Sequence, residues 1–265
     1  MLVNTIHQET MTVKSSETDF RQQLKLSNLF LWLQDAGADH ADRLGWGFHD
    51  LAAKDYAWVL SRIKVRCFDF PHLGDSVTVQ TWPKGIHQKV FFMRDYLLTA
   101  EDGRQIAAAT SAYLVINAQT RRMMLPGALD LTMPDNDGRS AIDEPLEHIA
   151  PVEPLRDCYT VHVGYSMVDV LGHVNNSRYI DWITDCFSME EHEAHCLSWL
   201  QINYLNEVKP GESVRLERGE RPGQPSSAYV TGMNQTTGAK AFEAEMGWDQ
   251  DAGDVAPDDS TQPAG

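Results

Sequence analysis

Two segments of the chain place apolar side chains at the three- and four-residue spacing of an amphipathic helix. The first apolar face consists of Leu26, Leu29, Phe30 and Leu33. The second consists of Tyr179, Ile183, Cys186 and Phe187. The spacing predicts one helix that ends near Gly37 and a second that begins within the polar stretch GHVNNSRYIDW, residues 172–182.

Alternating apolar and polar residues follow each of these helices and predict β-strands. The segments RIKVRCF and DSVTVQT follow the first helix, and WLQINYL and ESVRLER follow the second. The pair Asp102–Gly103 suits a tight turn between two longer strands. We therefore expect an α+β fold in which each half of the chain wraps a long central helix in an antiparallel sheet.

The two halves of the chain also share residues in a fixed order. Six identical pairs are separated by 150 residues: Val13 and Val163, Ser16 and Ser166, Asp19 and Asp169, Ser27 and Ser177, Trp32 and Trp182, and Asp35 and Asp185. Such self-similarity indicates a duplicated structural unit. We predict an N-terminal domain over 1–133, a linker over 134–157, a C-terminal domain over 158–248 and a disordered acidic tail over 249–265.

Composition and charge mainly argue against certain classes of protein. No apolar run approaches the roughly 18 residues of a membrane span, and the N-terminal residues do not have the pattern of an export signal. The four cysteines show no CxxC spacing, which argues against disulfides and against a zinc site. The formal charge of −16 disfavours nucleic acid and anionic membranes as partners. We expect a cytoplasmic protein with reduced thiols.

The stretch GHVNNSRYIDW, at the head of the second helix of a duplicated unit, resembles the acyl-acyl-carrier-protein thioesterases, which are built from tandem hot-dog folds. The segments FFMRDYLLTAEDGRQIAAATSAYLVINAQTRRMMLP and INYLNEVKPGESV, in the same order, add to the resemblance. It covers nearly the whole chain up to Trp248. The resemblance implies hydrolysis of a fatty acyl thioester on acyl carrier protein, without a metal or an organic cofactor.

By position, the catalytic residues of that family fall on Asp169, His173, Asn175 and Glu207. The chain departs from the plant enzymes in having Leu171 where they have an asparagine and Val208 where they have a cysteine. The loss of the cysteine fits direct attack by a water that a carboxylate activates. By the same analogy, Glu207 is expected to be the base, and Asp169 to orient His173 or the water.

The chemistry of a thioester hydrolase suits these residue types. A histidine can donate or shuttle a proton near neutral pH, and backbone N–H groups at a helix start, around Asn175 to Ser177, suit an oxyanion. We expect Asn176 and Tyr179 to contact substrate. The alternatives are that Asn175 or Asn176 only caps the helix, and that Glu207 is only a solvated turn acid.

The first half lacks a histidine beside Asp19, so we expect it to be catalytically silent and to form a wall of the acyl pocket. Phe30 and Trp46 are the candidates for a bulky side chain that closes the end of this pocket. A basic patch for an acidic carrier protein is predicted from Arg62, Lys64, Arg66, Arg121 and Arg122. A solvated sheet face is the alternative for this patch. The spacing of His192 and His195 is not that of a zinc enzyme.

Two other functions fit the same motifs. Leu171 and Gly172 reproduce the D-x-x-G-H-V-N-N form of single-domain acyl-CoA thioesterases. A non-catalytic acyl-thioester sensor is the second alternative, because hot-dog folds also bind ligands without turnover. Two tandem units can pack as a dimer of single units does, so we expect a pseudo-dimeric monomer or a homodimer.

Overall fold

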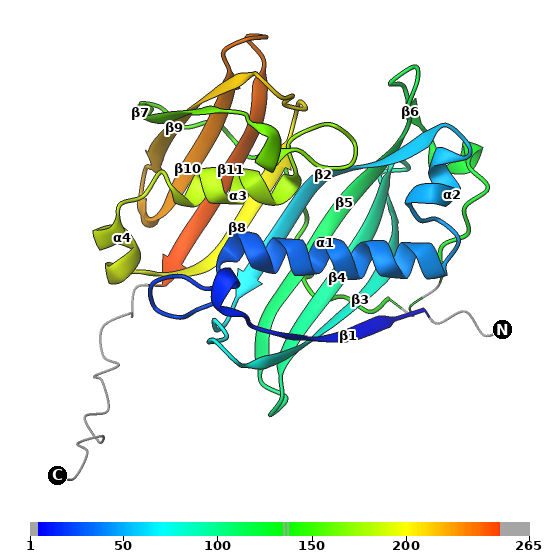
Figure 1. Cartoon of the computed structure of the whole chain (residues 1–265), viewed down its shortest axis with the longest axis horizontal. Helices are drawn as coiled ribbons and strands as arrows, with labels where there is room; N and C mark the ends of the chain where they lie inside the picture. The colour runs from blue at the N-terminus through cyan, green and yellow to red at the C-terminus, as the bar shows by residue number, and fades with distance from the viewer. Residues whose placement is uncertain (1–4, 135, 137, 250–265) are drawn as a thin grey trace.

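All strands that the structure describes belong to one antiparallel sheet (Figure 1). The computed structural model describes residues 5–134, 136 and 138–249. The strands are β1 His7–Thr12, β2 Tyr56–Cys67, β3 Ser76–His87, β4 Phe91–Ala100, β5 Gln105–Asn117, β6 Met123–Met124, β7 Arg156–His162, β8 Cys196–Tyr204, β9 Ser213–Arg221, β10 Gln224–Asn234 and β11 Lys240–Asp249. Their order in the sheet is β1-β3-β4-β5-β2-β8-β11-β10-β9-β7, and β6 pairs with β5.

Two helices, α1 (Leu26–Arg43) and α3 (Asn176–Thr184), lie on the same face of this sheet and contact each other (Figure 1). The shorter helices are α2 (Phe48–Ala52) and α4 (Met189–Ala194). Single 3-10 turns cover Ser15–Glu17, Pro126–Ala128 and Tyr165–Met167. The predicted architecture, a helix against an antiparallel sheet in each half of the chain, is confirmed.

The two halves join edge to edge through equivalent strands. Strand β2 pairs antiparallel with β8, and Lys64 lies opposite Gln201, the residue at the matching position of the repeat. A strand that pairs with its own counterpart is the arrangement that an isologous dimer produces between two subunits. The duplicated chain therefore reproduces within one molecule the interface of a two-subunit protein.

The first helix is longer than the sequence pattern predicts, because it continues through Gly37 to Arg43. At Gly37 a Cβ atom would lie 2.8 Å from the hydroxyl oxygen of Tyr96. This glycine therefore allows close helix–sheet packing and does not end the helix. The second helix is shorter than predicted, and Cys186 and Phe187 lie in the turn that follows it.

The predicted linker crosses the sheet on the side away from the long helices. The backbone amide of Ala141 donates to Asp95 on β4, and the side-chain amide of Gln201 on β8 donates to the carbonyl of Glu147. Strand β7 begins at Arg156, inside the segment predicted as linker. Residues 250–265 of the predicted tail lie outside the described residues. None of the helices that the structure describes is long and apolar enough to cross a membrane.

Candidate active site

A tight turn just before α3 holds His173 in place. One carboxylate oxygen of Asp169 accepts hydrogen bonds from the backbone N–H of Leu171, at 2.8 Å, and of His173, at 3.5 Å. The backbone N–H of Asp169 donates in return to the carbonyl of His173, at 2.8 Å. Gly172 closes the turn with a φ of +78°, a conformation that favours glycine. Asp169 thus positions His173 through the backbone.

The imidazole of His173 contacts the carboxylate of Glu207. The Nε2 atom of His173 lies 3.0 Å from Oε2 of Glu207, which comes from the loop after β8. These side chains are 20% and 33% exposed, so solvent reaches both. The local motif around His173 and the distant Glu207, which were predicted separately, are therefore brought together as a potential acid–base pair.

Arg121 completes this cluster from the other half of the chain. Its guanidinium forms an ion pair with Oε1 of Glu207, while Oε2 faces His173. Arg121 lies in the turn between β5 and β6 and has a φ of +58°. Its sequence context predicts a place in the carrier-protein patch instead. No local signal marks it as a partner of Glu207, because the two residues lie far apart in the chain and in different repeats.

The cap of α3 is Asn175. Its Oδ1 accepts hydrogen bonds from the backbone N–H of Ser177, at 2.9 Å, and from the hydroxyl of Ser177, at 2.8 Å. The backbone N–H of Asn175 donates to Met167 O. Two of the three amides predicted to bind an oxyanion are therefore already used. The backbone N–H of Asn176 has no acceptor within the described part of the chain, so it is free to donate a further hydrogen bond.

A cavity of about 290 Å³ opens between the two halves next to this turn. Asp169, Val170, Leu171 and Asn176 line it from the second half. The rest of its wall comes from the first half and is mostly apolar, with Ala41, Trp46, Leu51, Trp58 and Phe92 among the lining residues. Such a cavity suits an alkyl chain. A larger hollow of about 970 Å³ between Glu153 and Trp248 contains none of the predicted catalytic residues.

The structure places two other predicted contact residues away from this cavity. Tyr179 is buried and packs edge-on against Tyr204 and Phe242, and burial raises the pKa of its hydroxyl. Phe30 is buried in the core. Neither belongs to the cavity lining, whereas Trp46, the other predicted stopper, does. The apolar helix spacing that singled out Tyr179 and Phe30 reports core packing here.

The predicted basic patch falls into two groups. Lys64 and Arg66 on β2 both form ion pairs with Glu144 of the linker, and Arg62 donates to the carbonyl of Leu146 at 2.8 Å. Arg121 lies instead at Glu207, and Arg122 beside it is exposed. The cations of β2 thus pair with the linker, and the exposed basic residues next to His173 and Glu207 are Arg121 and Arg122.

The first repeat forms the same turn without the histidine. Asp19 accepts hydrogen bonds from the backbone N–H of Arg21, at 2.8 Å, and of Gln23, at 2.9 Å. Gln23 stands at the position of His173, and Lys25 takes the cap position without a side-chain capping bond. The scaffold of the turn is thus retained in both repeats, while the imidazole is present only in the second.

Comparison with known proteins agrees with this arrangement. Residues 4–125 match the acyl-ACP thioesterase N-terminal domain, and residues 156–250 match the acyl-ACP thioesterase C-terminal domain. The chain is 28% identical over 215 residues to the palmitoyl-acyl carrier protein thioesterase of Gossypium hirsutum, covering 76% of this chain and 52% of that protein. It is 23% identical over 234 residues to oleoyl-acyl carrier protein thioesterase 1 of Arabidopsis thaliana, covering 78% of this chain and 62% of that protein. The chain thus spans between about half and two thirds of the length of these two relatives.

Solved structures show the same fold along nearly the whole chain. An acyl-ACP thioesterase from Bacteroides thetaiotaomicron superposes with a TM-score of 0.80 at 24% identity, covering 94% of this chain and 100% of that one. The 12:0-ACP thioesterase of Umbellularia californica superposes with a TM-score of 0.73 at 20% identity, covering 93% of this chain and 98% of that one. The two domain matches and the tandem hot-dog architecture together establish that the chain belongs to the acyl-ACP thioesterase family.

Proposed function

We propose that the protein hydrolyses fatty acyl thioesters of acyl carrier protein to free fatty acid and holo-carrier protein. The observation that carries the proposal is the contact between His173 and Glu207 beside an apolar cavity whose lining includes Asp169 and Asn176. Membership of the acyl-ACP thioesterase family supports the substrate class. The reaction needs a base, an oxyanion donor and a dry groove, and the site offers a group for each.

In the proposed mechanism, the His173–Glu207 pair removes a proton from a water molecule as its oxygen attacks the thioester carbonyl carbon. The backbone N–H of Asn176 donates to the oxyanion that forms. The carbon–sulfur bond then breaks, and the protonated pair returns the proton to the thiolate of the carrier's phosphopantetheine arm. Asp169 positions His173 through the turn, and Arg121 holds the second oxygen of Glu207.

The acyl chain is proposed to occupy the cavity on the first half of the molecule. Its apolar lining excludes water from the chain, and Asp169 and Asn176 in that lining place the carbonyl next to the turn of α3. This assigns the N-terminal domain the role of pocket wall and the C-terminal domain the chemistry. It explains why both repeats retain the turn scaffold although only one retains the histidine.

The exposed cations at Arg121 and Arg122 are proposed to receive the acidic carrier protein at the mouth of this site. Arg62, Lys64 and Arg66 are not included, because they lie against the linker and away from the catalytic pair. Arg121 is included because its side chain is 49% exposed although it also pairs with Glu207. A cytoplasmic location and a pseudo-dimeric monomer, with or without further dimerisation, remain predictions. The pairing of β2 with β8 supports the pseudo-dimeric arrangement within one chain.

The test is thiol release from palmitoyl carrier protein and from palmitoyl-CoA by the wild type, His173→Ala and Glu207→Gln. We expect the carrier thioester to be preferred and both substitutions to lower the rate by about a hundredfold or more, as for loss of an acid–base group. His162→Ala and Glu193→Gln change exposed residues of the same types in the same domain and serve as matched controls.

The alternative functions give different results in this assay. Faster turnover of palmitoyl-CoA than of the carrier thioester would identify an acyl-CoA thioesterase. Binding of both thioesters without turnover would identify the non-catalytic sensor. A rate that survives both substitutions in the His173–Glu207 pair would refute the proposed site while leaving the activity in place.

A further inference from the structure

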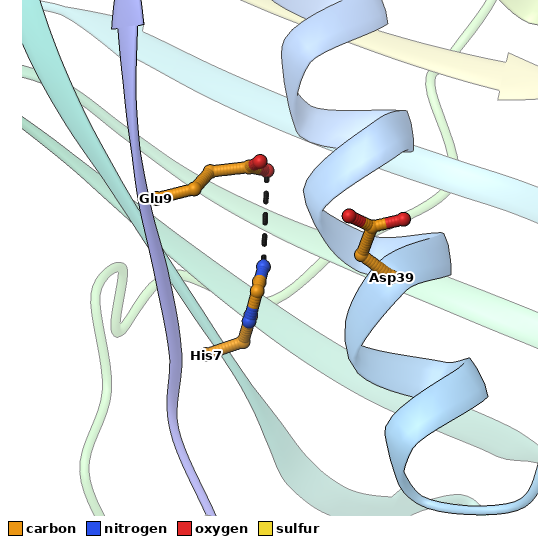
Figure 2. Close-up of side chains that lie close together, drawn as sticks. All are labelled: His7, Glu9 and Asp39. Atoms are coloured by element: carbon orange, nitrogen blue, oxygen red, sulfur yellow. Dashed lines mark ion pairs between the residues drawn. The ribbon is translucent and has the colours of Figure 1, made fainter.

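A second cluster of chemically active side chains lies in the N-terminal domain, between the edge strand β1 and helix α1 (Figure 2). His7 and Glu9 are two residues apart on β1, so both side chains point to the same face of the strand. Asp39 extends toward them from α1. One nitrogen or oxygen atom from each of the three residues lies within 4.8 Å of the other two.

The His7 side chain lacks the hydrogen bonds that a buried imidazole requires. It is only 2% exposed, and neither ring nitrogen has a hydrogen-bond partner among the described residues. Its Nε2 atom lies 3.9 Å from Oε1 of Glu9, too far for a hydrogen bond, and that buried oxygen is also without a partner. Unsatisfied buried polar groups are costly, and an ion bound between them is one standard explanation.

The charged groups around this point include three carboxylates and the guanidinium of Arg43. Glu9 lies near two further carboxylates, those of Asp35 and Asp39, and burial together with these charges raises the pKa of Glu9. No lysine or arginine of the described residues forms an ion pair with Glu9 or Asp39.

The neighbouring basic groups do not complete the cluster. Arg94 donates to Thr81 Oγ1 at 3.1 Å and lies 3.0 Å from Nδ1 of His40, and the His40 ring stacks on His7 with centroids 5.8 Å apart. These contacts hold the His7 ring from one side and leave its Nε2 edge turned toward Glu9, as Figure 2 shows. The three ligating groups therefore share a small volume between the strand and the helix.

We propose that His7, Glu9 and Asp39 bind a divalent first-row transition-metal ion, with Zn²⁺ as the best match. One imidazole nitrogen and two carboxylate oxygens are ligands that Zn²⁺ accepts at about 2.0 to 2.2 Å, with a water in the fourth position. Side-chain rotations that move each ligating atom by about an ångström bring all three atoms to bonding distance from one ion. An imidazole ligand disfavours Mg²⁺ and Ca²⁺, which prefer oxygen donors.

The ion is assigned a structural role. It would tie β1, which pairs only with β3 at the edge of the sheet, to the long helix α1. The three ligands neither line the acyl cavity nor contact His173 or Glu207. The site is therefore independent of the catalytic proposal, and metal binding should raise thermal stability without being required for thiol release.

The experiment is a titration of the full, untagged and chelator-treated chain with Zn²⁺, followed by calorimetry and by thermal unfolding. We expect one Zn²⁺ per chain and a midpoint about 5 °C or more higher at saturating metal. His7→Gln and Asp39→Asn should each weaken binding at least tenfold and remove the shift. His162→Gln, which removes an exposed histidine elsewhere, should leave both unchanged.

Co²⁺ provides a second readout that excludes the four cysteines as ligands. Its visible absorption should appear without a thiolate charge-transfer band and should be lost in Asp39→Asn, whose partly exposed side chain can be changed with little risk to folding. Absence of saturable Zn²⁺ binding, binding that both ligand variants retain, a thiolate band, or equal competition by Mg²⁺ would each overturn the proposal. None of these outcomes depends on the thioesterase assay.

Discussion

Ala41 lies on α1 in the wall of the cavity that we assign to the acyl chain, and it offers a direct test of that assignment. It is buried, and leucine at this position adds three carbon atoms on the cavity side of the helix. Leucine is also a good helix former, so the substitution changes the cavity with little effect on the helix itself. We predict that Ala41→Leu shortens the acyl chain that the enzyme prefers.

The magnitude follows from the volume that the new side chain occupies. The three added carbon atoms fill part of the cavity of about 290 Å³, so about three methylene groups of a bound acyl chain lose their place there. Each methylene group that loses its buried position costs about 0.8 kcal/mol. Three such groups amount to about 2.4 kcal/mol, or roughly a fiftyfold loss in kcat/KM for chains that fill the cavity.

The assay is thiol release from a series of acyl carrier proteins of increasing chain length. Long chains should lose roughly fiftyfold in kcat/KM by the estimate above, while chains too short to reach Ala41 keep their rate. Ala52→Leu, an exposed position on α2 outside the lining, is the matched control. Leu51→Ala enlarges the cavity and should favour longer chains, at a stability cost of about 2 to 5 kcal/mol. A uniform change across all chain lengths in Ala41→Leu would refute the placement of the acyl chain.

Three further predictions concern stability and reactivity. Asn175→Ala removes the α3 cap and should lower the free energy of unfolding in urea by about 1 kcal/mol; an unchanged midpoint would contradict the capping role. Gly247→Ala places a Cβ 2.3 Å from Trp199 Nε1 and should cost about 1 to 3 kcal/mol, visible as a lower thermal midpoint unless the indole moves freely. A hydrogen bond from Cys186 lowers the pKa of Cys158, so its alkylation should begin at lower pH, and Cys186→Ala should shift that profile upward.

Local sequence patterns predicted a turn or strand correctly where contacts between residues close in the chain determine its structure. The turn at Asp102–Gly103 joins β4 to β5, with Gly103 at a φ of +85°. The motif before α3 placed Asp169 and His173 in one turn because all of its hydrogen bonds lie within five residues. Local patterns failed at Gly37, where a glycine that indicates a helix end in sequence is required by contact with Tyr96 on another element.

Contacts between distant segments required the structure. The ion pair of Arg121 with Glu207 joins two repeats, and the ion pairs of Lys64 and Arg66 with Glu144 join a strand to the linker. In the sequence these cations look alike, since each is a basic residue in or next to a strand. Only the path of the chain decides which of them is covered and which lies at the site.

The sequence by itself determined the duplication, the α+β architecture and the turn before α3, because periodicity and short-range hydrogen bonding act between residues that are close in the chain. Tertiary structure alone decided that β2 pairs with β8, that the cavity lies mainly on the first repeat while His173 comes from the second, and that His7, Glu9 and Asp39 meet. The physical reason is that these arrangements depend on how two packed layers align, and no single segment encodes that alignment.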